Sequence, residues 1–291
     1  MSGAKEIIAG PPGKDVSISI EAQQSLYDML PKDIKAKGEL TIAVEANAGL
    51  PNSITSPDGK ERGMIIDMAN VLGAVIGIPV DLKTASFDQL IPGLQANRYD
   101  LSTSTFSDTL PRREVVDFVN DLTLVSPLLV VPASNKDLVG TLTPETTCGM
   151  TAAVNKGGAE ADVLVNASKE CVQSGKQPID IQLFPSNPVA MLAVKSGRAK
   201  TAIFSGAQAK WIVENDKTLA LGAPTPGIIG YDGIALPKGS PLTPVIRAAL
   251  LNLHSSGTWL QILKLYGAQD MAPTEKVINN LKPFDPKDAN G

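Results

Sequence analysis

The sequence predicts an α/β fold of two lobes, with the second lobe inserted within the first. The main observation is an alternation of short apolar runs, typical of buried strands, with segments whose apolar residues recur at helical spacing. Such alternation indicates mostly parallel sheets with helices on their faces. The length of 291 residues also favours two domains. An apolar run at residues 122–131 suggests a strand that leaves the first lobe.

The individual elements follow from local signals. Residues 40–44 are apolar with β-branched members and predict the first strand, and S-P-D-G-K at 56–60 is a turn signal. A helix is expected over 64–76, because Gly77 and Pro79 close it. The remaining elements show the same signals: strands at 79–82, 180–184 and 201–204, and helices at 88–96, 159–176, 188–195, 208–215, 242–255 and 259–266.

Composition and motifs exclude several classes of function. The net charge is -4 and no run is rich in Lys or Arg, so nucleic acid is not an expected partner. No apolar run approaches the roughly 20 residues that a spanning helix needs. Clusters with metal-ligand spacing are absent from the sequence, as are the G-x-S-x-G and Walker patterns, and the lone His254 reads as a cap or surface residue. We therefore expect no metal and no cofactor.

The stretch from residue 102 to 118, S-T-S-T-F-S-D-T-L-P-R-R-E-V-V-D-F, carries the most chemistry per residue. Its hydroxyls and backbone N–H groups can donate short hydrogen bonds to an anion, and a guanidinium adds a planar fork that grips a carboxylate with two parallel bonds. The alternative is a capped loop with solvated arginines.

This stretch and the preceding S-F-D-Q-L-I-P-G-L-Q-A-N-R-Y-D-L at 86–101 resemble family 3 solute-binding proteins, the extracytoplasmic receptors of polar amino acid ABC importers. The resemblance continues through G-E-L-T-I-A-V at 38–44 and S-G-T-W-L-Q-I-L-K-L-Y-G at 256–267. It implies a type II clamshell with mixed sheets, two interlobe crossings and closure over a ligand. We accordingly expect an N-terminal arm at 1–36, lobe 1 at 37–130 and 231–275, lobe 2 at 131–230, and a C-terminal tail at 276–291.

The resemblance implies a binding protein and not an enzyme. Its partners would be a small polar ligand with a carboxylate, either an amino acid or a related compound, and an ABC permease; the protein itself would be a monomer. The N-terminus lacks a signal-peptide pattern. We interpret the chain as an extracytoplasmic protein whose export signal was removed, either periplasmic or a cell-surface lipoprotein of Gram-positive type. The alternative is an enzyme of the same fold, such as a cyclohexadienyl dehydratase, with Glu45 or Asp232 as general acid if burial raises its pKa.

In lobe 1 the resemblance assigns ligand contacts by register. Arg112 is the arginine that grips the carboxylate, and Arg113 is then a flanking surface charge. Ser107 takes the place of a threonine hydroxyl, and Thr105 lies where a backbone group usually reaches the ligand. Phe87 matches an aromatic that lines the pocket. For each of these residues the alternative is ordinary packing or a solvated loop.

Departures from the family pattern bear on specificity. Residues 46–52 read A-N-A-G-L-P-N where relatives carry an aromatic, so that aromatic wall is missing. Glu45 occupies the usual acidic position before it, or is a solvated edge charge. In lobe 2 the register gives Val154 and Asn155 in the turn that opens a ligand-binding helix. Ser205 stands where relatives carry the acid that pairs with an α-amino group.

A serine cannot balance an ammonium as a carboxylate does. One explanation is that another acid substitutes, and the candidates are Glu45 and Asp232, the latter in the segment that the family uses as the return crossing. The other explanation is that the ligand is not a standard α-amino acid. For Asp232 the alternative role is a hinge-loop carboxylate that caps a turn.

Cys148 and Cys171 are the two cysteines of the chain. If oxidised, the pair would close a loop of about 24 residues and stabilise the fold by about 3 kcal/mol. The alternative is two buried free thiols. Export favours the disulfide, and similar pairs in relatives from Gram-positive bacteria favour it as well.

Overall fold

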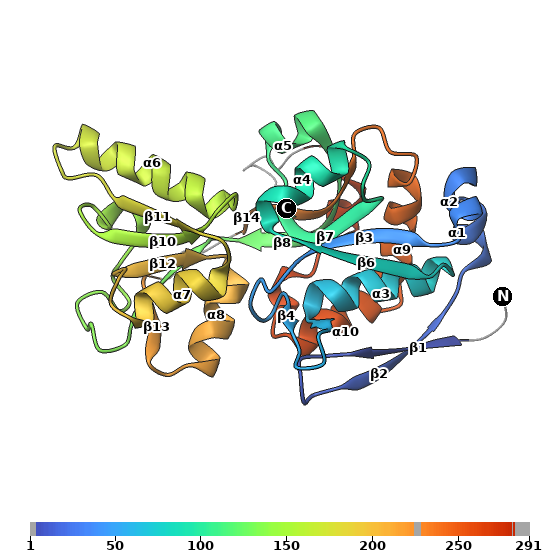
Figure 1. The fold of residues 1–291 in the computed structure, drawn as a ribbon, viewed down its shortest axis with the longest axis horizontal. Coiled ribbons are helices and arrows are strands. Elements are labelled where there is room, and N and C mark those ends of the chain that lie inside the picture. Colours follow the sequence, from blue (N-terminus) through green and yellow to red (C-terminus); the bar gives the residue numbers. More distant parts are fainter. Residues whose placement is uncertain (1–3, 224–227, 281, 283–291) are drawn as a thin grey trace. The chain divides into compact units, whose positions relative to one another are not determined.

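The computed structural model describes residues 4–223, 228–280 and 282, and the chain divides into two compact units. Unit 1 contains Met1–Ala46, Pro51–Leu124 and Ile229–Gly291, and unit 2 contains Asn47–Leu50 and Val125–Ile228. Each unit is built on its own five-stranded mixed sheet with helices packed on it (Figure 1). The predicted two-lobed α/β class is therefore confirmed. Within the described ranges, none of the helices combines the length and apolar character that a membrane span requires.

The sheet of unit 1 has the strand order β6-β3-β7-β14-β8. Strand β3 is parallel to β6 and β7, whereas β14 is antiparallel to β7. Successive residues of β3 point to opposite faces: Ala43 packs with Leu90 and Leu94 of α4, and Val44 packs with Ile65 and Ile66 of α3. Helices α3 and α4 therefore cover opposite faces of this sheet, as Figure 1 shows.

The elements of unit 1 span most of the N-terminal half and the C-terminal end of the chain. The strands are β1 (Ala4–Ala9), β2 (Val16–Glu21), β3 (Leu40–Glu45), β4 (Ile54–Thr55), β5 (Glu61–Arg62), β6 (Val80–Ala85), β7 (Leu101–Ser107), β8 (Val116–Val125) and β14 (Ile228–Pro237). The helices are α1 (Gln24–Asp28), α2 (Lys32–Lys37), α3 (Met64–Ile76), α4 (Phe87–Gln95), α5 (Leu110–Val115), α9 (Thr243–Ser255), α10 (Thr258–Leu265), η2 (Gln269–Met271) and α11 (Glu275–Asn279).

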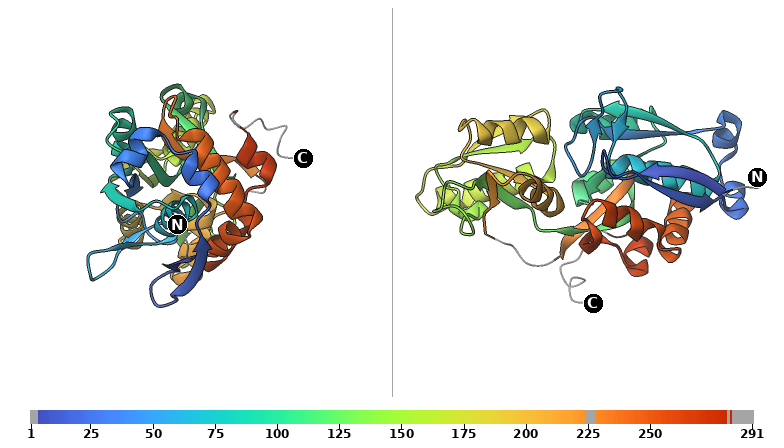
Figure 2. Two further views of the ribbon diagram at one scale, coloured as in Figure 1. Left: turned by 90° about the vertical axis from the view of Figure 1, so that its right-hand side faces the viewer. Right: turned by 90° about the horizontal axis from the view of Figure 1, so that it is seen from below.

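The N-terminal segment forms a β-hairpin, where the sequence predicted only an arm. Strands β1 and β2 pair antiparallel, and their alternate residues, among them Ile18 and Ile20, are buried. The backbone N–H of Gly10, at the turn, donates to Oδ2 of Asp67 on α3 at 2.7 Å. Figure 2 shows the hairpin alongside α3. This segment therefore packs as part of unit 1. The expected C-terminal tail falls partly on α11, and its residues 281 and 283–291 lie outside the described residues.

Asp67 links three elements of unit 1. Its Oδ2 accepts the Gly10 bond and a second bond, at 2.7 Å, from the hydroxyl of Tyr266, which directly follows α10. The carboxyl is 5% exposed, and this burial raises its pKa to about 6, although both hydrogen bonds act in the opposite direction. Hairpin, α3 and the C-terminal helices thus meet at one buried acid.

The sheet of unit 2 has the order β11-β10-β12-β9-β13, with β10 parallel to both β11 and β12. Strand β9 is antiparallel to β12 and β13. The elements are β9 (Leu128–Pro132), η1 (Pro144–Thr146), β10 (Thr151–Asn155), α6 (Ala159–Gln173), β11 (Asp180–Phe184), α7 (Asn187–Lys195), β12 (Thr201–Phe204), α8 (Gly206–Asn215) and β13 (Leu219–Leu221). The carboxyl ends of the three parallel strands meet at one edge, and α6, α7 and α8 all begin just beyond it.

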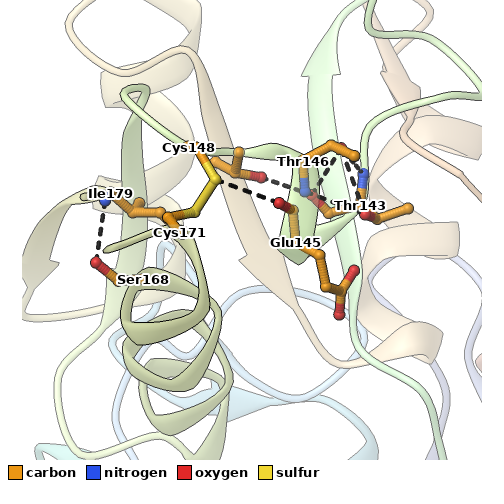
Figure 3. The surroundings of a disulfide bond; sticks show 8 residues. Thr143, Glu145, Thr146, Cys148, Ser168, Cys171 and Ile179 are labelled. Carbon is orange, nitrogen blue, oxygen red and sulfur yellow. Dashed lines mark hydrogen bonds between the residues drawn. A yellow bond between two sulfur atoms is a disulfide. The ribbon is translucent and has the colours of Figure 1, made fainter. Parts of the chain in front are cut away.

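A disulfide joins the two cysteines within unit 2. Cys148 lies before β10 and Cys171 lies in the last turns of α6, with their Cα atoms 5.6 Å apart (Figure 3). Beside it, the side chain of Thr143 caps the short helix η1 by accepting from the backbone N–H of Thr146. The loop before β10 is therefore fixed both covalently and by a capping box.

Candidate functional site

Arg112 lies in α5, and its guanidinium is held in place before any ligand arrives. Its Nη1 donates to the backbone carbonyl of Ser107 at 2.9 Å. The guanidinium carbon lies 5.6 Å from the ring centroid of Phe87 and 5.8 Å from that of Phe106. These two rings are themselves 4.9 Å apart. Phe87 is the first residue of α4, so the guanidinium is placed close to a helix N-terminus. The structure thus brings Arg112, Ser107 and Phe87 together.

Thr105 has an unusual backbone. Its φ is 49°, in the left-handed region, which is a genuine outlier for a β-branched residue. The pairing of β7 with β14 shifts register at this point: Gly233 lies opposite Phe106, but Ala235 lies opposite Ser102. Bulges of this kind redirect backbone groups and are frequent next to functional sites. The strain lies where sequence reasoning expected a backbone contact to the ligand, and that contact stays a prediction.

Three hydroxyls of the 102–118 stretch serve the fold. Ser102, Thr103 and Ser104 are buried in β7. Oγ of Ser104 accepts from the backbone N–H of Glu45 at 2.8 Å, and Oγ1 of Thr103 donates to the carbonyl of Ile65 at 2.8 Å. The Ser102 hydroxyl donates to Oγ of Ser104 within β7, at 3.3 Å. These three residues were expected among the anion donors, but they are buried and their hydroxyls are bonded inside unit 1. Thr105 and Ser107 remain half-exposed.

Arg113 is not the flanking surface charge that the sequence predicted. Its Nε and Nη2 donate to the two carboxylate oxygens of Asp108, each at 2.5 Å. The Asp108 side chain is fully buried, and that of Arg113 is 16% exposed. The pair is bidentate and desolvated, so Arg113 neutralises a buried charge. This pair could not be predicted from the sequence, since Asp108 and Arg113 belong to no common motif.

Glu45 ends β3 and is 4% exposed, so it is not a solvated edge charge. Its carbonyl accepts a hydrogen bond from the hydroxyl of Ser53 at 2.7 Å, which fixes the strand end. Its backbone N–H is bonded to Ser104, as described above. A ligand contact of the Glu45 side chain stays a prediction.

Asp232 is a buried residue of β14, 2% exposed, and not a hinge-loop carboxylate. It lies opposite Ser107 in the sheet, and the next residue, Gly233, lies opposite Phe106. Because neighbouring residues of a strand face opposite sides, Asp232 points away from the face that carries Phe106 and its contact with Arg112. This geometry weighs against a direct role for Asp232 beside that guanidinium.

On its own face of the sheet, Asp232 approaches Asp121 of β8, which sequence reasoning missed. Burial, and then the charge of Asp232, raise the pKa of Asp121 well above its usual range. Oδ1 of Asp121 has no hydrogen-bond partner among the described residues. The backbone carbonyl of Asp121 accepts from Nε1 of Trp259 at 3.0 Å. No local motif marks two acids that meet across adjacent strands.

In unit 2, Val154 and Asn155 are not in the turn that opens the helix, contrary to expectation. Both belong to β10, and Val154 is fully buried in the core beneath α6. The turn instead comprises residues 156–158, and α6 begins at Ala159 with Gly158 as its N-cap. Gly157 has a φ of 83°, which suits glycine. A pair of glycines after the apolar strand was the signal that could have found this turn.

Ser205 is the N-cap residue of α8, and its side chain accepts no capping hydrogen bond. It is half-buried at the edge of the sheet where α6, α7 and α8 begin. Three residues later, Gln208 is 2% exposed, and sequence reasoning did not single it out. Both Ser205 and Gln208 place neutral polar side chains at this edge of the unit 2 sheet.

The comparisons with known proteins decide the family. The profile of the bacterial extracellular solute-binding proteins, family 3, matches residues 40–269. The chain belongs to this family. It is 28% identical to the arginine-binding protein ArgT of Corynebacterium glutamicum over 260 residues, which cover 86% of this chain and 81% of ArgT. It is 24% identical to the L-cystine-binding protein TcyJ of Escherichia coli K12, covering 81% of this chain and 85% of TcyJ.

Solved structures give the same fold. The substrate-binding protein AbpA of Streptococcus pneumoniae, bound to L-arginine, matches with a TM-score of 0.71 at 24% identity, covering 82% of this chain and 99% of that one. The ancestral protein AncCDT-1, a precursor of cyclohexadienyl dehydratase, matches with a TM-score of 0.69 at 22% identity, covering 80% and 97%. The curated relatives are named as binding proteins and not as enzymes, in agreement with the expectation for this chain.

Proposed function

We propose that this chain is the substrate-binding protein of an ABC importer and captures a small amino-acid-like ligand by its carboxylate. The placement of Arg112 carries this proposal. Its guanidinium is half-buried, bonded to the Ser107 carbonyl and set against two aromatic rings. A fork that is oriented in advance loses less side-chain entropy when it binds a carboxylate. The N–H groups at the start of α4, next to Phe87, add further donors for an anion.

The ligand class follows from the acids of the chain. Ser205 stands where the family pattern carries an acid, and Asp232 faces away from the side of the sheet that carries Phe106. We propose that the carboxylate supplies most of the recognition and that a free α-ammonium contributes little. Relatives named for arginine make L-arginine the first amino acid to test.

Delivery to a permease and an extracytoplasmic location complete the proposal. The family profile describes extracellular proteins, AbpA is named as the substrate-binding protein of an ABC transporter, and the disulfide suits an oxidising compartment. We expect the protein to act as a monomer, either in the periplasm or held at the cell surface by a lipid. Size-exclusion chromatography with light scattering checks the monomer.

Native mass spectrometry tests the ligand directly. Tightly held ligands stabilise the folded state and often survive purification. We expect the purified protein to release a small carboxylate on denaturation. A thermal-shift panel then compares L-arginine, L-glutamine, L-cystine, agmatine (arginine without its carboxylate) and 5-guanidinopentanoate (arginine without its α-amino group). The proposal fails if only compounds without a carboxylate are released or raise the melting temperature.

A further inference from the structure

Four residues that follow β3 belong to unit 2. These residues, Asn47–Leu50, form the loop that lacks the aromatic of the family pattern. Asn47 and Gly49 have φ values of 49° and 87°, and Ala48 is fully buried. Asn and Gly are the residues that adopt this left-handed conformation most readily, so both suit the tight turn of this loop.

The side-chain amide of Gln208 links this loop to α7. Its Nε2 donates to the carbonyls of Ala48 and Gly49, at 2.9 Å and 3.3 Å, and its Oε1 accepts from Nδ2 of Asn187 at 2.7 Å. Gln208 lies in the first turn of α8 and Asn187 is the first residue of α7. The bond from Asn187 sets the orientation of the amide, because it requires Oε1 to face α7 and so turns Nε2 toward the loop.

The fit around Gly49 is too close for any side chain. A Cβ at this position would lie 3.1 Å from Nε2 of Gln208 and 3.2 Å from Cγ of Pro188, and the positive φ adds strain for other residues. The loop backbone therefore lies directly on the first turns of α7 and α8. Gln208 is buried there, and an amide is costly to bury unless it is fully bonded.

We propose that Gln208 is a positioning residue of the ligand site: it fixes loop Asn47–Leu50 at the start of α8, where Ser205 is the N-cap. This inference rests on the proposed function. The fixed loop backbone takes over the wall that an aromatic forms in the family pattern. Gln208 thus acts on the ligand through the loop and sets affinity and selectivity without touching it.

Two variants separate this role from simple stability. Gln208→Leu keeps the size but removes both donors and the acceptor. Asn187→Asp leaves Gln208 intact but offers an acceptor to the amide, which turns Oε1 toward the two loop carbonyls. Gln173→Leu, at the exposed last residue of α6, is the matched control for the first, and Asn215→Asp, at the exposed last residue of α8, is the control for the second. All affinities are measured where each variant is fully folded.

We expect both test variants to bind L-arginine about tenfold more weakly, as loss of the clamp requires. Their ratio of affinities for L-arginine and 5-guanidinopentanoate should also change, which a purely structural role would not cause. Amide hydrogen exchange at residues 47–50 should become faster, and the controls should match the wild type. Faster exchange with unchanged affinities and ratio would overturn the proposal. A wild-type protein that binds none of these probes would instead overturn the proposed function and, with it, this role of the clamp.

Discussion

The two units prepare different kinds of contact. In unit 1 the site residues are charged and constrained: Arg112 is fixed by a carbonyl and two rings, and Thr105 is strained. In unit 2 they are neutral. Ser205 is an N-cap residue whose side chain makes no capping hydrogen bond, and the Gln208 amide bonds the loop Asn47–Leu50. Under the proposed function, we expect unit 1 to recognise charge and unit 2 to contribute hydrogen bonding and shape.

Loss of the buried pair of Arg113 and Asp108 should have the largest effect on stability within unit 1. Arg113→Ala should lower the free energy of unfolding by about 3–5 kcal/mol, because it leaves the buried Asp108 carboxylate without its partner. Urea denaturation measures the loss. The double variant Arg113→Gln with Asp108→Asn should recover part of it, since no uncompensated charge remains. A loss below about 1 kcal/mol would show that this pair is not desolvated.

Removal of the disulfide tests whether unit 2 can be destabilised without unit 1. Cys148→Ser with Cys171→Ser opens a loop with a sequence separation of 23 and should cost unit 2 about 3 kcal/mol. Hydrogen exchange should then show faster opening in β10 and α6, while β3 and α3 of unit 1 keep their protection. Equal loss in both units would mean that they unfold as one cooperative structure.

The smallest expected effect concerns acid-dependent stability. Burial raises pKa values in unit 1, at Asp67 to about 6 and at Asp121, whereas in unit 2 hydrogen bonds from Lys195 and Thr218 lower the pKa of Asp216 to about 2. The folded-state pKa of Asp67 lies above its unfolded value. Its stabilising contribution to the free energy of unfolding is therefore fully present below about pH 4 and is lost as the pH rises through about 6.

In the wild type, the titration of Asp67 should lower the free energy of unfolding by about 1 kcal/mol between about pH 5 and pH 7. Asp67→Asn should not show this decrease. Thermal unfolding of the wild type and the variant across this range measures the difference. Asp58→Asn, in an exposed turn, is the control and should leave the wild-type slope unchanged. An identical slope in wild type and Asp67→Asn would mean that Asp67 does not titrate in this range.

The sequence was most informative where a motif is continuous. Arg112 could be placed because V-V-D-F follows it at a fixed distance, and the structure brings it to Phe87 and Ser107. The hairpin at 4–21 was missed, although V-S-I-S-I-E alternates and G-P-P-G marks a turn. The register in unit 2 failed, since A-A-V-N has no such anchor and reads equally well as a strand or as its end.

Contacts between distant residues could not be predicted. The pairing of Gln208 with the loop at Ala48 spans 160 positions, and the approach of Asp121 to Asp232 depends on which strands become neighbours. Neither belongs to a local pattern. Buried polar groups of this kind are chosen by tertiary packing, so they appear only once the strand order is known.

Calorimetric titration of three related compounds into the wild type and Arg112→Ala tests the central claim most directly. With L-arginine as reference, we expect agmatine to bind the wild type about 100-fold more weakly and 5-guanidinopentanoate less than tenfold more weakly. In Arg112→Ala the difference between L-arginine and agmatine should shrink to less than about tenfold, while Arg98→Ala, an exposed control, keeps it. Agmatine binding as tightly as L-arginine, or a larger loss for 5-guanidinopentanoate than for agmatine, would contradict the account.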